Sequence, residues 1–215
     1  GAKEAVVGPD GTTAYVAVTD GFATVDASDP SAPRVLAERR SLLADRENGP
    51  LRGIQDVKVD GDRLLVVGPA NGGPALRAAL LYDVRDPAAP ERLAVHETPF
   101  AIHNAVLEDG RAYLTGNDGE ANPLAILDAE RGDLLGTWSP LDRDERWGAV
   151  HPGLRPIHDV WVHGGRAYCA YWDAGTWIVD VRDPGAPSFV GRVGGVDRQT
   201  LAALPDDAIR RQSLE

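Results

Sequence analysis

Hydrophobic and polar residues alternate with a period of two over Ile157–Val193, in short runs separated by turn residues. The connectors between the runs are rich in glycine, proline and aspartate, which tight turns favour. The pattern predicts four strands: His158–Val162, Arg166–Trp172, Thr176–Val181 and Ser188–Val193. A four-stranded sheet of this size needs a packing partner for its apolar face. It therefore indicates a particular fold only if the same unit recurs along the chain.

The same order of strands recurs in three other segments, approximately residues 5–36, 54–95 and 102–138. The third strands align as FATVDASDP, ALLYDVRDP, LAILDAERG and TWIVDVRDP. Each contains an aspartate at the strand end, and these aspartates are 57, 45 and 52 residues apart: Asp26, Asp83, Asp128 and Asp180. A near-constant period with four strands per copy predicts an all-β fold, a β-propeller of four-stranded antiparallel blades. An immunoglobulin-like sandwich also has many short strands, but it predicts no such repeat.

The predicted blades cover residues 4–37, 54–95, 102–138 and 157–193, within one propeller domain over residues 1–195. Residues 196–215 are predicted to be a helical extension, with helices over 197–203 and 205–212, or the start of another blade. Four blades are at the small end of the propeller range, so the chain is expected to be part of a larger ring. Open faces on the end blades would then favour homo-oligomers.

The segments TWIVDVRDPGAPSFVG and ALLYDVRDPAAPERLA resemble the LVIVD repeat, found in propellers of archaeal and bacterial surface or exported proteins. The resemblance covers residues 5–193 and implies the propeller architecture. It also implies an extracellular or cell-surface location, with the cytoplasm as the alternative, and it implies no particular activity. The third copy departs from the pattern, because a generic charged turn over Asp128–Gly132 replaces the Asp-Pro turn.

The net charge of −11 at pH 7 argues against nucleic acid and anionic membranes as partners, since phosphate binding needs a basic face. Arginine supplies almost all of the basic charge, and Lys3 and Lys58 are the only lysines. This acidic composition is typical of halophilic proteins, although a GC-rich genome produces much of the same bias. No apolar run approaches the roughly 20 residues that span a bilayer. The single cysteine, Cys169, excludes an internal disulfide.

The long loops are predicted to gather at one rim of the propeller. Loops that follow a second strand and loops that join two blades open on the same side, because successive strands run in opposite directions. Every long or glycine- and proline-rich insertion falls into these two groups: residues 39–53, 68–76, 116–123 and 139–156. Binding residues concentrate on loops held by a rigid scaffold, so this loop-rich rim is the predicted functional surface.

Three polar pairs stand at the start of the innermost strands: Gln55–Asp56, His103–Asn104 and His158–Asp159. First strands line the channel of a propeller, so these side chains are expected to meet near its mouth. Three interpretations remain open: hydrogen bonds that join adjacent blades, a polar ring for a small ligand, or a divalent metal ion on His103 and His158.

Three other residues are candidates for a ligand site. Trp172, at the predicted end of a second strand, could offer an apolar platform to a sugar or an aromatic ligand. Trp147 and His151, on the longest connector, are expected to be mobile. The recurring aspartates are expected to bond to their own backbone in turns rather than to hold calcium. No serine nucleophile elbow, phosphate-binding glycine loop or HExxH zinc motif occurs.

These patterns favour a non-catalytic binding module that presents the loop-rich rim to a protein, a glycan or a small ligand. One alternative is a metal-dependent enzyme with its site around His103 and His158. The other is a purely structural repeat protein that assembles with like chains.

Overall fold

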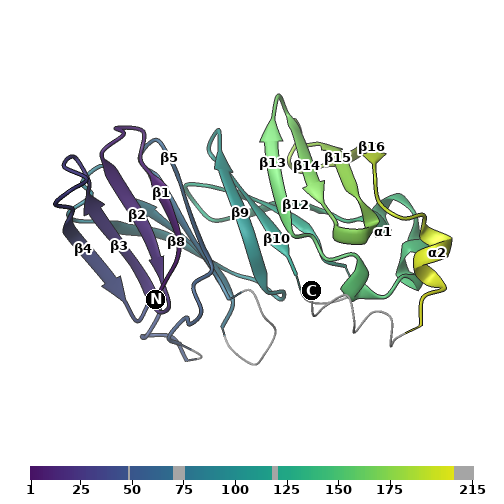
Figure 1. Ribbon diagram of the computed structural model, residues 1–215, viewed down its shortest axis with the longest axis horizontal. Helices are drawn as coiled ribbons and strands as arrows, with labels where there is room; N and C mark the ends of the chain where they lie inside the picture. Colours follow the sequence, from purple (N-terminus) through teal and green to yellow (C-terminus); the bar gives the residue numbers. More distant parts are fainter. Residues whose placement is uncertain (48, 70–75, 118–120, 206–215) are drawn as a thin grey trace.

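The computed structural model of the chain is all-β and consists of four separate antiparallel sheets of four strands, side by side (Figure 1). It describes residues 1–47, 49–69, 76–117 and 121–205. The predicted loop over 68–76, the loop over 116–123 and the helix over 205–212 therefore lie partly outside the described residues. No helix among the described residues is long and apolar enough to cross a membrane.

Each predicted blade forms one sheet. The first contains β1 (Ala2–Val7), β2 (Thr13–Val18), β3 (Gly21–Asp26) and β4 (Arg34–Arg40). The second contains β5 (Asp56–Asp60), β6 (Arg63–Gly68), β7 (Ala78–Asp83) and β8 (Glu91–Glu97). The third contains β9 (Ile102–Glu108), β10 (Arg111–Gly116), β11 (Leu124–Asp128) and β12 (Leu134–Trp138). The fourth contains β13 (Asp159–His163), β14 (Arg166–Ala170), β15 (Thr176–Asp180) and β16 (Ser188–Val193).

The connector between the third and fourth blades contains short helices rather than an open loop: α1 (Pro140–Arg143), η1 (Glu145–Ala149) and η2 (Pro152–Leu154). Ser139 begins this run, because its hydroxyl accepts the Leu141 N–H while its own N–H donates to Asp142. A further short helix, η3 (Trp172–Ala174), follows β14. The predicted helix over 197–203 is present as α2 (Arg198–Ala202) and is capped by Asp197.

The first strands of the blades form the inner side of the array. Strands follow chain order in every sheet, and β1, β5, β9 and β13 contact one another in succession. Figure 1 places the first and fourth blades at opposite ends of the molecule. The chain therefore forms four propeller-like blades, and the larger ring stays a prediction.

The core lies between the blades. Successive side chains of a strand point to opposite faces, so Leu64 packs toward the first blade and Leu65 toward the third. The interface between the third and fourth blades is the most aromatic, with Tyr113, Trp138 and Trp177 in one cluster. Each fully buried side chain of this size contributes about 1.5–3 kcal/mol, so interblade packing is the main source of stability.

The outer faces of the two end blades carry exposed apolar side chains. Val7 and Val35 are exposed on the first blade, and Trp161 and Val193 are exposed on the fourth. The expected open faces are therefore present, and the oligomers that they would favour stay a prediction.

The recurring aspartates bond to their own backbone, as the sequence predicts. In each case the carboxylate accepts the N–H of the residue two positions later: Ser28, Arg85, Glu130 and Arg182. An arginine also pairs with each carboxylate. The hydrogen bonds from Ser28 and Arg34 lower the pKa of Asp26 to about 2. These residues therefore shape turns.

Candidate functional site

The structure brings His103 and His158 together on the inner side of the array. The centroids of the two imidazoles are 4.8 Å apart, and the ring planes are inclined by 49°. His103 lies in β9, and His158 immediately precedes β13, so the two rings come from the first strands of neighbouring blades. We refer to these two residues as the histidine pair.

A bulge in β9 explains how His103 reaches this position. Ala105 pairs with Leu114 and Ile102 pairs with Gly116, so His103 and Asn104 together oppose Thr115 alone. The Thr115 hydroxyl accepts the Asn104 N–H at 2.7 Å and donates to the Asn104 carbonyl at 2.9 Å. The bulge is thus held by a buried side chain, and it re-aims the residues that it contains.

The Nδ1 atom of His103 is buried and has no hydrogen-bond partner in the described part of the chain. Burial lowers the pKa of His103, the nearby His158 lowers it further, and Asp159 raises it. The imidazole is therefore neutral at neutral pH, with one nitrogen available to donate or to accept. Leaving a buried polar group unsatisfied costs about 1–3 kcal/mol, so a group that reaches this atom and hydrogen-bonds to it would be stabilised there.

Trp172 is the third member of the site. Its ring lies 5.8 Å from the His158 ring in an edge-on arrangement, and the side chain is 52 % exposed. The prediction of a strand end was wrong here, because Trp172 begins the η3 turn with a φ of 36°. A positive φ in a bulky residue is strained, and such strain persists only where the surroundings enforce it.

A hollow of about 370 Å³ adjoins His158 and Trp172. Its other lining residues come from the end of β14 and the start of β15: Ala170, Tyr171, Gly175 and Thr176. Gly175 has a φ of 80°, and a Cβ atom there would lie 2.6 Å from the Gly194 carbonyl oxygen. The turn that presents Trp172 therefore requires glycine at this position.

Asp56 joins two blades instead of facing the histidine pair. Its carboxylate accepts the Ala105 N–H at 2.9 Å and the Lys58 ammonium at 2.7 Å, and it is buried. Asn104 and Asp159 each accept the N–H of the next residue, at 2.8 Å in both cases. Asp56 therefore agrees with the interpretation that these polar residues form hydrogen bonds between adjacent blades.

Among the described residues, no contact joins Gln55 to the histidine pair. Its backbone N–H donates to the Val67 carbonyl, which extends the pairing of β5 with β6. Within the described ranges, His, Cys, Asp and Glu side chains form no group of three or more that could hold a metal ion. The histidine pair therefore supplies two protein ligands to any metal that binds.

Trp147 and His151 lie in the short helices of the connector. Trp147 is only 5 % exposed and packs edge-on against Trp177, with the ring centroids 5.2 Å apart. The expectation that Trp147 is a mobile loop residue was wrong, because it packs in the core of the fourth blade. His151 is exposed, and its Nδ1 accepts the Gly153 N–H at 3.1 Å, which caps η2.

Two segments of the chain, residues 10–38 and 156–194, match the family model of the LVIVD repeat. These two segments are therefore similar to LVIVD repeats. The first match contains β2, β3 and most of β4, and the second contains the entire fourth blade. No curated protein matches the sequence.

Two solved structures show the same fold at low sequence identity. A functionally unknown protein from Desulfotomaculum acetoxidans DSM 771 is 12 % identical with a TM-score of 0.66, and the match covers 91 % of this chain and 57 % of that one. A proposed 6-phosphogluconolactonase from Bacteroides uniformis ATCC 8492 is 13 % identical with a TM-score of 0.62, and the match covers 92 % and 55 %. The chain thus spans a little over half of the length of each, and the likeness concerns the fold alone.

Proposed function

We propose that this LVIVD-repeat protein is a non-catalytic binding module whose histidine pair and Trp172 hold a small sugar-like ligand. The observation that carries the proposal is the buried, unpartnered Nδ1 of His103 beside the His158 ring. A ligand hydroxyl can satisfy that atom, and the flat, exposed indole of Trp172 can cover an apolar sugar face.

The groups around this site bind rather than react. Burial lowers the pKa of His103, so its imidazole is neutral at neutral pH. The described lining of the hollow contains no carboxylate, and beside His158 it consists of Trp172 and residues at the end of β14 and the start of β15. Such a surface suits recognition of a glycan or a free sugar. The proposal includes an exported or surface location, which the similarity of two segments to the LVIVD repeat supports. Fractionation of the native cells would test the location.

The imidazole resonances of the histidine pair provide the direct test of binding. We expect titration with a panel of neutral monosaccharides and disaccharides to shift the His103 and His158 signals saturably for at least one sugar. His103→Ala should weaken that binding at least tenfold, whereas His96→Ala on β8 should leave it unchanged. If no sugar in the panel shifts these signals, the proposed function is wrong.

The alternative function is a metal-dependent enzyme, and the neutral imidazole of His103 next to His158 favours it. Calorimetric titration with Zn²⁺ or Ni²⁺ distinguishes the two functions. Stoichiometric binding that both His103→Ala and His158→Ala remove would support the metal centre, and binding at less than about a tenth of an equivalent would discard it.

A further inference from the structure

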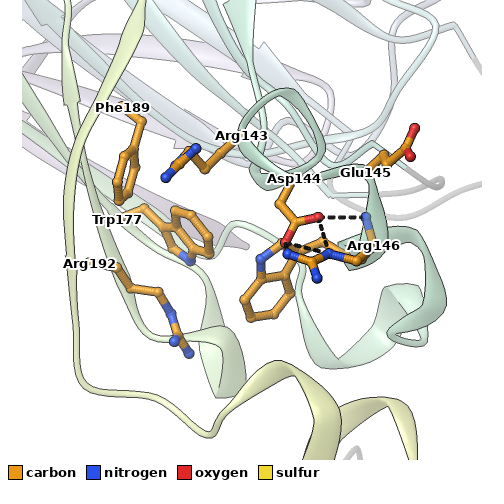
Figure 2. A pocket seen from close by; sticks show the side chains of 8 residues that line it. Arg143, Asp144, Glu145, Arg146, Trp177, Phe189 and Arg192 are labelled. Carbon is orange, nitrogen blue, oxygen red and sulfur yellow. Dashed lines mark hydrogen bonds and ion pairs between the residues drawn. The ribbon is translucent and has the colours of Figure 1, made fainter.

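A second hollow, of about 540 Å³, lies on the fourth blade between the connector and the strands β15 and β16 (Figure 2). Its lining combines aromatic and charged residues: Arg143, Asp144, Glu145, Arg146, Trp147, Trp177, Phe189 and Arg192. We refer to it as the arginine hollow. It shares no lining residue with the hollow beside His158.

The wall of the arginine hollow is aromatic. Trp147 and Trp177 meet edge-on, and the Trp177 and Phe189 rings also meet edge-on with centroids 5.6 Å apart. Both tryptophans are buried and Phe189 is half-buried, so the wall is rigid and belongs to the core of the blade. An apolar ligand surface can therefore pack there at little cost in side-chain entropy.

Two arginines lie over this wall. The guanidinium carbon of Arg143 is 5.2 Å from the Phe189 ring centroid, and that of Arg192 is 5.1 Å from the Trp147 ring. Arg192 donates its Nε–H to the Ala174 carbonyl at 2.7 Å and one Nη2–H to the Val196 carbonyl at 2.6 Å. A guanidinium has five N–H donors, so Arg192 is held in place with further donors left for a ligand.

The acidic residues that line the arginine hollow form no ion pair with these two arginines, and Asp197, whose charge raises the pKa of Arg192, lies outside the lining. Asp144 binds Arg146 through paired hydrogen bonds and lies 4.0 Å from Arg198. Figure 2 shows the Glu145 carboxylate pointing away from the hollow. Among the described residues, no carboxylate lies within salt-bridge distance of Arg143 or Arg192. Two guanidinium charges thus face one hollow in a protein whose net charge is −11.

The fourth blade departs from the repeat at this site. Trp177 stands three residues before the blade's recurring aspartate and pairs across the sheet with Arg192. The matching pairs in the other blades contain neither residue type: Ala23 with Glu38, Leu80 with Val95, and Ala125 with Thr137. A blade therefore forms without the tryptophan–arginine pair, and the fold alone does not require it.

We infer that the arginine hollow binds a small organic carboxylate that has a flat apolar body. Arg143 and Arg192 would hold the carboxylate with charge-assisted hydrogen bonds, and the aromatic wall would cover the apolar body. An inorganic anion has no apolar surface that could pack against the aromatic wall. A neutral molecule with the shape of the proposed carboxylate would leave the two guanidinium groups without a counter-charge. Selectivity for a ligand with both parts is therefore the distinguishing property.

The test uses benzoate as the probe, with benzamide as its neutral counterpart and inorganic phosphate as an anion without an apolar body. Binding is measured by the fluorescence of Trp147 and Trp177 and by calorimetry, at constant ionic strength. We expect benzoate to bind saturably and at least tenfold more tightly than benzamide or phosphate. Equal affinity for all three, or no saturable benzoate binding, would overturn the inference.

Variants assign the binding to this hollow. Among the described residues the Arg143 guanidinium makes no hydrogen bond and only lies over the Phe189 ring. Arg143→Gln should therefore leave thermal stability unchanged and weaken benzoate binding at least tenfold. Arg92→Gln, on the outer strand of the second blade, is the matched control and should have no effect. If Arg143→Gln and Arg92→Gln bind benzoate equally, the probe binds elsewhere and the assignment is wrong.

Arg192 needs a conservative change because its guanidinium also anchors two carbonyls. Arg192→Lys keeps a charge but loses the planar fork, so we expect weaker benzoate binding together with a modest loss of thermal stability. A loss of stability without any change in benzoate affinity would mean that Arg192 acts only in the fold.

Discussion

The carboxylate of Asp56 on β5 accepts the backbone N–H of Ala105 on β9, at 2.9 Å, across the boundary between the second and third blades. Lys58 binds the same carboxylate and lies 3.9 Å from Glu4 on β1. One chain of polar contacts therefore runs along the inner side of the array through three first strands. It adds directional contacts to interfaces whose cores are apolar, so it helps to specify how the blades sit against each other.

Removal of the Asp56 carboxylate should destabilise the protein. Asp56→Ala leaves the Ala105 N–H without its partner from β5 and leaves Lys58 partly buried without its nearest counter-charge, which should cost about 3 kcal/mol. Urea unfolding measures the loss. Asp60→Ala on the same strand is the control, since Asp60 is exposed, and it should stay within about 0.5 kcal/mol of the wild type. Similar losses in both variants would contradict the role of Asp56.

The Tyr171 hydroxyl should contribute measurably to the contact between the third and fourth blades. It is buried and donates to the Asn122 carbonyl at 3.1 Å. Tyr171→Phe removes this hydrogen bond and should lower the free energy of unfolding by about 1 kcal/mol. Tyr168→Phe, on the outer face of the same blade, serves as the control. An equal effect of the two changes would show that the hydroxyl of Tyr171 is not what matters.

The stability of the protein should fall as pH decreases through the titration range of histidine. The pKa of His103 in the folded state is lowered from 6.5, first by burial and then by His158. Between that lowered pKa and 6.5 the unfolded chain binds more protons, so the contribution of His103 is complete above 6.5 and is lost below it. Urea midpoints measured from pH 7.5 to 5 should show this slope, and His103→Phe should flatten it. An unchanged slope in the variant would assign the effect to other groups.

The outer face of the fourth blade should mediate self-association. Trp161 is 61 % exposed and lies 5.5 Å from the Tyr168 ring, on the face that neighbouring blades use to pack together. Each blade packs one face on the preceding blade and the opposite face on the following blade. The outer face of the fourth blade can therefore pack on the outer face of the first blade of a second copy. Sedimentation should reveal concentration-dependent oligomers that Trp161→Glu disrupts and Leu93→Glu on β8 does not. A wild-type monomer at every concentration would contradict this.

The sequence alone was sufficient for the blades and their turns. A period of two identifies strands because alternate side chains share a face, and a repeat of strand order predicts repeated sheets. The turns at Asp26, Asp83, Asp128 and Asp180 were also predictable, since an aspartate that bonds to its own backbone needs only local geometry. The helices of the connector were missed, although Ser139 and Asp142 form a capping box that signals the first of them.

Only the tertiary structure decided what the polar residues do. Equivalent positions made Asp56, Asn104 and Asp159 look alike, yet among the hydrogen bonds of these three residues in the described part of the chain, only that of Asp56 with Ala105 reaches a neighbouring blade. The arginine hollow was likewise hidden, because Arg143 and Arg192 are 49 residues apart in the chain and meet only when the connector packs on β15 and β16. Turn and strand signals depend on neighbouring residues, whereas these contacts depend on how the twist and spacing of whole blades bring distant residues together.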